Sequence, residues 1–287
     1  MKFRFIQRHT NQFRVKLMCS VLGVSRSGYY AWSKRQPSAR EGANQGLRAL
    51  IRLLHRKSRR TYGYRRIHAA LVAQGVTCGK NRVARLMRED GLRARRRRRY
   101  KRTTQSRHNW PIAPNLLDQS FVATSPNQKW VTDITYIRTV EGWLYLSVVL
   151  DLYSRIVVGW AMKSDLTDSL TKKALKMALA RRQPQPGLLH HSDRGSQYAS
   201  ASYQKVLSAH KALSSMSRTG NVYDNAPMES FFATLKTELI HHRNYATRQQ
   251  AKTDIFEYIE VFYNRQRLHS ALGYLSPMAF DSLSVSP

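Results

Sequence analysis

Three acidic residues that are far apart in the chain lie in local settings that suit ligands of a shared metal centre. Asp133 lies in an apolar run of strand type, Asp193 follows a second short apolar run, and Glu229 lies at the start of an amphipathic stretch. A carboxylate buried in a strand is costly unless a cation compensates its charge. Carboxylate oxygens are preferred Mg²⁺ ligands, and two Mg²⁺ ions held in this way would support phosphoryl transfer.

Each acid taken singly also has an ordinary structural explanation. Asp133 could be a strand-edge or turn residue, Asp193 precedes Arg194-Gly195 and could belong to a turn, and Glu229 suits the first turn of a helix. Asp224 lies close to Glu229, but it precedes Pro227 in a loop and is interpreted as a turn residue. Only the joint placement of the first three acids indicates chemistry.

The pattern of residues 126–245 predicts an α/β domain. Three strands follow one another without a helix between them, which predicts an antiparallel meander, and helices then alternate with short strands. The expected strands are 130–137, 143–150, 155–162, 188–192 and 213–217, and the expected helices are 168–182, 199–209 and 227–239. This β-β-β-α-β-α-β-α order is the ribonuclease-H-like (integrase) arrangement, in which the three acids would meet at one edge of a mixed sheet.

The helix expected at 227–239 also carries a basic residue near its acid. Lys236 follows Glu229 by two helical turns, so both project from one face and the lysine could hold a DNA phosphate. The neighbouring apolar stripe would dock the helix on the core; it comprises Met228, Phe232, Leu235 and Leu239.

The charge of the chain is large and unevenly distributed. The formal net charge is +32 over 287 residues; residues 1–110 hold 30 Lys/Arg and three acidic residues, whereas residues 111–287 hold 19 and 14. Such asymmetry indicates a polyanionic partner, and double-stranded DNA fits better than an anionic membrane because no basic segment has a strongly apolar face. No 18-residue apolar run or secretion signal is present.

Two pairs of short helices are expected before the α/β domain. Residues 13–32 predict one pair, with Ser25 capping its second helix. Residues 64–73 and 81–89 predict another, with Val83, Leu86 and Met87 packed inward. Both pairs resemble helix-turn-helix units, and plain helical hairpins with solvated faces would show the same spacing. The basic residues expected on the DNA-facing side are Arg65, Arg66, Lys80, Arg82 and Arg85.

Residues 93–102 hold eight Lys/Arg, a density that disfavours packing. The run Arg95, Arg96, Arg97, Arg98 and Arg99 suits an extended arm along DNA phosphates, and a targeting or solubilising segment would look alike. The two cysteines, Cys19 and Cys78, form no zinc pattern and predict small core residues in a reducing, cytoplasmic setting.

Together these segments resemble the transposases of bacterial insertion sequences, in the integrase/DDE superfamily. The chain is most similar to the second-reading-frame (OrfB) proteins of two-frame elements that move by copying out and pasting in. The motifs that carry the resemblance are Gly28–Trp32, Tyr62–Arg66, Trp130–Tyr136, His191–Tyr198, Asp224–Glu238 and Tyr258–Pro277. They extend over nearly the whole chain, and their order and spacing agree as well as their residues.

The resemblance implies a DDE transposase that cleaves and joins DNA at the ends of an insertion sequence. It implies Asp133, Asp193 and Glu229 as the catalytic, metal-binding triad for two Mg²⁺ ions, with Mn²⁺ as a substitute, and Lys236 as the accompanying basic residue. Arg194 and Asn225 would position DNA or the acids, and Arg265 and Arg267 would lie in a basic loop near DNA. The enzyme would act as a homo-oligomer on DNA, in the bacterial cytoplasm at the nucleoid.

Five regions are expected along the chain. They are an N-terminal helical region (1–58), a second helix-turn-helix-like region (59–93), a basic linker (94–125), the integrase core (126–245) and a C-terminal helix with a basic tail (246–287).

Two other functions stay open: a ribonuclease-H-like nuclease that only hydrolyses, and a non-catalytic DNA-binding regulator. In this family the active form is often a frameshift fusion with an upstream-frame protein, and the residues leave open whether this chain acts alone.

Overall fold

A computed structural model describes residues 1–36, 38–95, 110–219 and 221–284, except for the Val222 side chain. The chain divides into two compact units, residues 1–53 and residues 54–287, and each is described by itself. No helix in the described ranges is both long enough and apolar enough to cross a membrane. The predicted arginines Arg96, Arg97, Arg98 and Arg99 lie outside the described residues.

The first unit is a small helical cluster. Helices α1 (Lys2–Arg8), α2 (Val15–Val21) and α3 (Arg26–Lys34) enclose a core of Ile6, Met18, Cys19 and Tyr29. The Ser25 hydroxyl accepts a hydrogen bond from the Gly28 amide at 3.0 Å, so the predicted N-cap of α3 is confirmed. The two helices expected over 13–32 are therefore present, joined at Gly23 with a positive φ of 60°.

The second unit begins within α4 (Ala39–Lys57) and continues into α5 (Tyr64–Ala73) and α6 (Lys80–Glu89). Helices α5 and α6 contact each other, and Val83, Leu86 and Met87 are buried as expected. The turn between them contains Gly75 at a φ of 77°, a conformation that glycine adopts without a steric penalty. This pair is the expected second helix-turn-helix-like unit.

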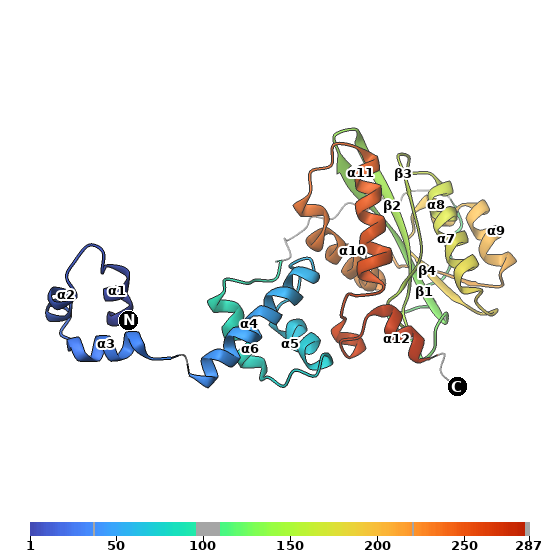
Figure 1. Ribbon diagram of the computed structural model, residues 1–287. Coiled ribbons are helices and arrows are strands. Elements are labelled where there is room, and N and C mark those ends of the chain that lie inside the picture. Colours follow the sequence, from blue (N-terminus) through green and yellow to red (C-terminus); the bar gives the residue numbers. More distant parts are fainter. Residues whose placement is uncertain (37, 96–109, 220, 285–287) are drawn as a thin grey trace. The chain divides into compact units, whose positions relative to one another are not determined.

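A five-stranded mixed sheet forms the centre of the second unit (Figure 1). Its strands are β1 (Lys129–Thr139), β2 (Gly142–Asp151), β3 (Val157–Lys163), β4 (Leu189–Ser192) and β5 (Leu213–Met216), in the order β3-β2-β1-β4-β5. The β1–β2–β3 meander is antiparallel, as expected, and β4 and β5 are added in parallel beside β1. The predicted ribonuclease-H-like arrangement is confirmed.

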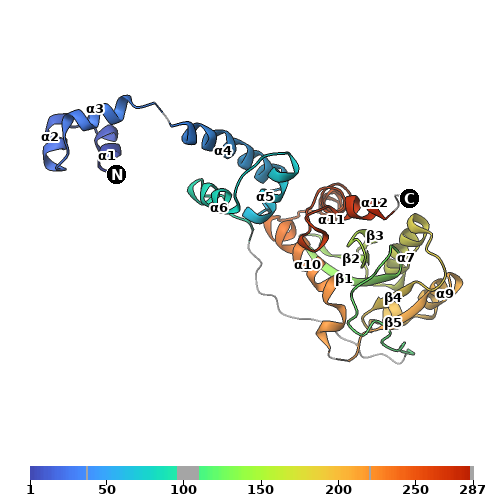
Figure 2. The same cartoon turned by 90° about the horizontal axis from the view of Figure 1, so that it is seen from below.

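Helices cover both faces of the sheet (Figures 1 and 2). On one face α7 (Asp168–Arg182) packs on β2 and β3, with α8 (Ser196–Ala199) and α9 (Ala201–Ala209) beside it; on the other, α10 (Ala226–Glu238) and α11 (Arg248–Phe256) contact β1. The remaining turns and helices are η1 (Val222–Asn225), η2 (Ile240–His242), the π-helix η3 (Glu257–Tyr263), η4 (Ser270–Leu272) and α12 (Pro277–Leu283).

The prediction of a single helix at 199–209 is wrong at its start, because α8 ends at Ala199 and α9 begins at Ala201. Ser200 adopts extended backbone angles and accepts a hydrogen bond from the Tyr203 amide, so it ends α8 and caps α9.

Gly159 on β3 explains how closely α7 packs on the sheet. A Cβ at this position would lie 2.3 Å from the Ala174 carbonyl oxygen and 2.7 Å from the Ala178 amide nitrogen.

Candidate active site

The sheet register brings two of the three candidate acids together. Strands β1 and β4 are parallel neighbours, and the last pair in their register is Val131 with His191. Asp133 and Asp193 each follow that pair by two residues along their own chain segments. Two acids that are distant in sequence therefore lie at equivalent positions where β4 ends, as parallel strands that carry a site commonly arrange them.

Backbone amides hold both carboxylates. Asp133 Oδ1 accepts from the Ile134 N–H at 2.7 Å, and Asp193 Oδ1 accepts from the Gly195 N–H at 2.9 Å. The second bond closes the tight turn that leads from β4 into α8. Both acids are half-buried as whole residues.

The third acid, Glu229, lies in the first turn of α10 and is exposed. The start of α10 is fixed to β1 beside Asp133, because Asn225 Nδ2 donates to the Thr132 carbonyl at 3.3 Å. Asn225 is buried, and its Oδ1 atom has no hydrogen-bond partner in the described part of the chain. This amide oxygen is a buried acceptor close in sequence to Glu229.

Electrostatics show that the predicted residues are neighbours. The pKa of Asp133 is raised well above its usual value, mainly by burial and then by the negative charge of Asp193, while Glu229 raises it further and Lys236 lowers it. A negative cluster in a partly desolvated site is costly without a cation. As placed, however, no three His, Cys, Asp or Glu side chains within the described ranges are close enough to share a metal ion.

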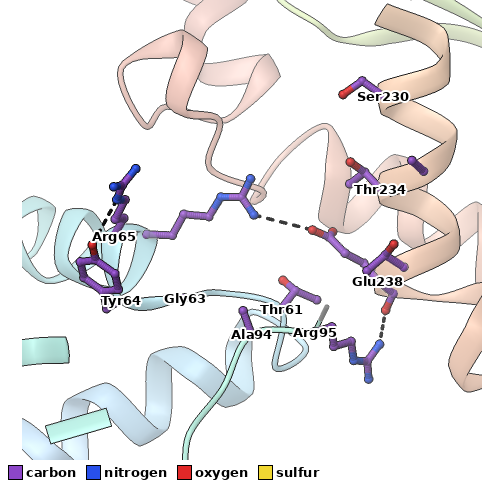
Figure 3. A pocket seen from close by; sticks show the side chains of 12 residues that line it. Thr61, Gly63, Tyr64, Arg65, Ala94, Arg95, Ser230, Thr234 and Glu238 are labelled. Atoms are coloured by element: carbon purple, nitrogen blue, oxygen red, sulfur yellow. Dashed lines mark hydrogen bonds and ion pairs between the residues drawn. The ribbon is translucent and has the colours of Figure 1, made fainter. Parts of the chain in front are cut away.

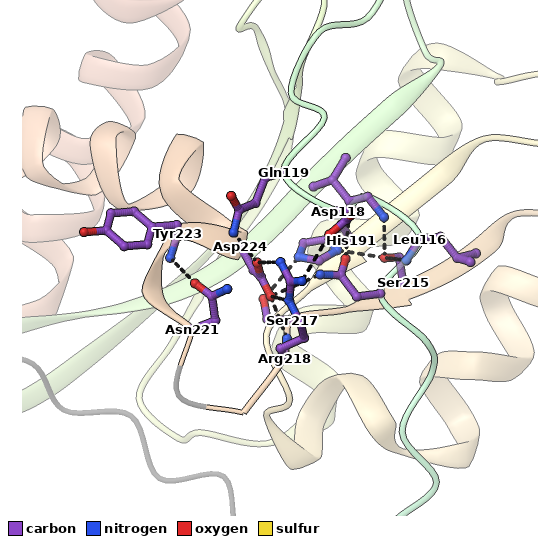
Figure 4. A network of polar contacts seen from close by, with 12 residues as sticks. Leu116, Asp118, Gln119, His191, Ser215, Ser217, Arg218, Asn221, Tyr223 and Asp224 are labelled. Carbon is purple, nitrogen blue, oxygen red and sulfur yellow. Dashed lines mark hydrogen bonds and ion pairs between the residues drawn. The ribbon is translucent and has the colours of Figure 1, made fainter.

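Asp224 has a different role from its neighbour Glu229 (Figure 4). Its buried carboxylate accepts five hydrogen bonds. Arg218 donates three of them, from its backbone amide, Nε and Nη2, at 2.8–3.1 Å. Asn115 donates the fourth at 3.1 Å, and Gln119 donates the fifth at 3.0 Å. The Arg218 hydrogen bonds hold the pKa of Asp224 far below its usual range. Asp224 thus fastens the loop before α10 to the segment around Asn115, in agreement with its interpretation as a structural loop residue.

Arg194 also braces this loop. Its Nε donates to the Ser217 carbonyl at 2.6 Å, and its Nη1 donates to Thr219 Oγ1. These two bonds tie the residue after Asp193 to the loop after β5.

The histidines of β4 contact hydroxyl groups. His190 lies 3.1 Å from the Tyr203 hydroxyl, and His191 lies 2.8 Å from Ser215 Oγ.

A buried network at the other end of α10 was not anticipated. Glu238 accepts a forked pair of hydrogen bonds from Arg267 at 2.8–3.1 Å and another from the Tyr258 hydroxyl at 2.8 Å. Arg66 Nη1 lies 3.7 Å from the same carboxylate. The Tyr62 hydroxyl donates to the Gln266 carbonyl and accepts from the Leu268 amide. The Tyr62–Arg66 motif is therefore joined to the integrase core.

The expected DNA contact by Arg267 needs correction for this reason. Only 5 % of Arg267 is exposed, and its guanidinium is committed to Glu238 and to His269 Nε2, so it stabilises the fold instead of reaching DNA. The sequence signal for the buried pair of Glu238 and Arg267 was the position of Glu238, an acid between the buried residues Leu235 and Leu239.

The other candidate DNA contacts lie in several places. Arg65, Lys80 and Arg265 are exposed, Arg82 and Arg85 are half-buried on α6, and Arg85 pairs with Glu89 at 2.9 Å. Arg95 is half-buried and donates to the Glu238 carbonyl. Arg65, Arg66 and Arg95 line one cavity, which also borders α10.

Known proteins resemble the chain over its full length. Integrase core domain models match residues 123–222 and 229–284, and an HTH-like domain model matches residues 42–100. An Escherichia coli protein described as transposase InsF for insertion sequence IS3A is 44% identical over 288 residues, which cover 100% of both chains. The chain belongs to the family of insertion-sequence transposases.

A second relative supports the same family. A Shigella sonnei protein described as an uncharacterized 31 kDa protein of insertion element IS600 is 50% identical, over 92% of this chain and 97% of its own length. This transposase is accordingly an enzyme of DNA cleavage and strand transfer that combines a DNA-binding HTH-like region with an integrase core.

Solved structures are more distant. A chain of the simian T-cell lymphotropic virus intasome in complex with PP2A regulatory subunit B56 gamma has a TM-score of 0.48 and 19% identity, over 76% of this chain and 70% of that one. A likeness of this size carries no weight beside the full-length relatives.

Proposed function

We propose that Asp133, Asp193 and Glu229 form the metal-binding catalytic triad of this transposase and hold two Mg²⁺ ions, which Mn²⁺ could replace. The observation that carries the proposal is the β1–β4 register, which aligns Asp133 with Asp193. Asn225 supports it by tying the start of α10, and so Glu229, to the residue before Asp133. Small side-chain movements of the exposed Glu229 would complete the set.

The donor set fits hard divalent cations. It consists of carboxylate oxygens, with the unpartnered Asn225 Oδ1 nearby, and Mg²⁺ prefers oxygen ligands. Bound there, the ions would activate an attacking water or DNA 3′-hydroxyl and stabilise the leaving 3′-oxygen. Lys236 would hold a phosphate beside the acids, because it follows Glu229 by two turns of α10. Arg194 would keep the loop after β5 in place.

The DNA that the enzyme acts on would be the ends of its own insertion sequence and a target duplex. Lys80, Arg82 and Arg85 on α6 are proposed to contact DNA from the HTH-like region, and Arg265 from the C-terminal segment. Arg96, Arg97, Arg98 and Arg99 are proposed to follow phosphates. Joining two ends to one target calls for several active sites, so we propose a homo-oligomer on DNA at the nucleoid in the bacterial cytoplasm, with the upstream-frame protein as a possible fusion partner.

Strand transfer with labelled element ends tests the proposal. We expect Asp133→Asn, Asp193→Asn and Glu229→Gln each to reduce cleavage and joining by a factor on the order of a thousand, because each removes a metal ligand. Binding to the same DNA should stay within about twofold of the wild type. Asp165→Asn, which changes an exposed acid paired with Lys163, is the matched control and should retain activity.

Two outcomes would contradict the proposal. Variants that lose DNA binding together with cleavage would show that the acids are structural. Wild-type ends that are hydrolysed but never joined would indicate a nuclease instead of a strand-transferase.

A further inference from the structure

A cavity of about 380 Å³ lies between the Tyr62–Arg66 motif and α10 (Figure 3). One wall contributes Thr61, Arg65, Arg66 and Arg95, and the other contributes Ser230 and Thr234 from α10. Figure 3 shows the α10 side chains facing the motif across this space. Three arginines, several residues with hydroxyl groups and one acid, Glu238, thus line the cavity.

The carboxylate does not neutralise the cavity. Glu238 accepts hydrogen bonds from Arg267 and Tyr258, which lie outside the lining, and it also lies 3.7 Å from Arg66. Its one negative charge therefore faces two cations. The pKa of Arg66 is lowered, first by burial and then by the positive charge of Arg267. Positive charge is therefore in excess in a partly desolvated place, which favours an anion with several acceptor oxygens.

The hydroxyl groups of Ser230 and Thr234 on α10 place the cavity close to Glu229 along the helix. Ser230 directly follows Glu229, and Thr234 lies one turn further, about 6 Å along the helix axis. A chain of phosphates along this face would pass within one residue of the candidate metal ligand, which projects from the neighbouring face of the helix. Serine and threonine hydroxyls and arginine side chains are the groups that most often bind DNA phosphates.

We propose that this cavity binds the phosphodiester backbone of the insertion-sequence end and guides the cleaved strand from the HTH-like region to Glu229. The inference rests on the proposed function and adds Tyr64, Ser230 and Thr234 to the DNA-contacting residues. Arg65 would make the main ionic contact, because it is an exposed residue of the cavity lining and its Nε donates to the Tyr64 hydroxyl.

Binding of an element-end duplex to the full chain in EDTA tests the inference without any cleavage. A single uncharged methylphosphonate linkage is moved along the strand, one position at a time. We expect the wild type to lose about tenfold in affinity at one discrete linkage near the cleavage site. Arg65→Ala should lose about as much on unmodified DNA, lower the salt slope by about one, and no longer respond to that linkage.

Two further variants complete the design. Thr234→Ala should give a smaller loss that is coupled to the same linkage. Lys205→Ala removes one exposed positive charge from α9, which packs on β5 and α7, and should respond to the neutral linkage like the wild type. Losses that simply add for Arg65→Ala and the neutral linkage at every position would overturn the proposal.

Competition and catalysis separate the remaining explanations. Inorganic phosphate that competes at matched ionic strength, with no coupling to any linkage, would show a free-anion site and reject the DNA assignment. Asp193→Asn should keep the wild-type linkage pattern. If that variant still cleaves DNA, the proposed triad fails while the cavity assignment stands; if the pattern is absent but Asp193→Asn is inactive, only the cavity assignment fails.

Discussion

Asp133 on β1 and Asp193 just after β4 each lie two residues past the same paired position, Val131 with His191, of two adjacent parallel strands. The strand register therefore brings the two acids to the same end of β4. Because both carboxylates are partly desolvated and carry like charges, they repel each other until a cation arrives.

This repulsion predicts opposite effects of Asp193→Asn with and without metal. In EDTA at pH 7 the variant should be more stable than the wild type by about 0.2–1 kcal/mol, since like charges on neighbouring strands destabilise a sheet. With excess Mg²⁺ the wild type should gain stability by ligand binding and the variant should gain much less. Urea denaturation in both buffers measures this; Asp165→Asn, which breaks an attractive pair with Lys163, should show neither effect. Equal Mg²⁺ responses in all three proteins would reject a shared metal site.

The Asp224 network predicts a pH-dependent contribution to stability. Asp224→Asn should lower the free energy of unfolding by about 1–3 kcal/mol at pH 7, because several donors lose a charged acceptor that is itself buried. The folded pKa of Asp224 lies below its unfolded value near 3.8, so the contribution is full above that value and declines as the pH falls below it. Denaturation of both proteins between pH 7 and pH 3 would show the difference narrowing.

Asp118 offers a matched control for Asp224. It pairs with the same arginine at 3.2 Å, but 72 % of its side chain is exposed. Asp118→Asn should change stability by less than about 1 kcal/mol. A comparable loss in both variants would mean that Arg218, and not the buried carboxylate, determines the effect.

The Glu238 network predicts a large loss from one neutralising change. Glu238→Gln should destabilise the protein by about 3–5 kcal/mol, because it leaves the buried Arg267 charge uncompensated. Glu257→Gln removes an acid that pairs with Arg59 at 2.6 Å but is 57% exposed, and it should cost no more than about 1 kcal/mol. Thermal unfolding at one buffer composition compares the two, and losses of equal size would contradict the assignment of Glu238 as the centre of the network.

The close approach of α7 to β3 predicts that Gly159→Ala is poorly tolerated. The new methyl would meet helix backbone, so we expect a loss of about 1–3 kcal/mol from overpacking. Gly46→Ala on the exposed side of α4 has open space and should instead stabilise by about 0.5–1 kcal/mol. A neutral Gly159→Ala variant would show that α7 can move outward freely.

Local patterns predicted most elements of the fold. The bounds of α5 and α7 agree with the expected 64–73 and 168–182, since apolar spacing and flanking turns mark both ends. The region expected at 246–287 contains α11, whose start at Arg248 is marked by a capping box of Thr247 and Gln250. The π-helix η3 has no such signature, because its hydrogen-bond pattern leaves no distinct apolar period.

Long-range pairing limited what could be predicted of the site. The motif resemblance indicated Asp133, Asp193 and Glu229, but the register that aligns the first two depends on strand pairing across the sheet. Arg267 was expected at DNA because its sequence neighbours are basic, and its ion pair with Glu238 is visible only in three dimensions. The domain boundaries and the roles of the triad stay predictions.

The hydrogen bonds of Tyr62 with Gln266 and Leu268 have a consequence for how such enzymes can be recombined. A hybrid that takes its HTH-like region from one relative and its integrase core from another would inherit only half of this junction. Such hybrids should work when the residues at 62, 66, 238 and 267 come from the same parent, and these four positions are the ones to graft first when a transposase is redirected to foreign DNA ends.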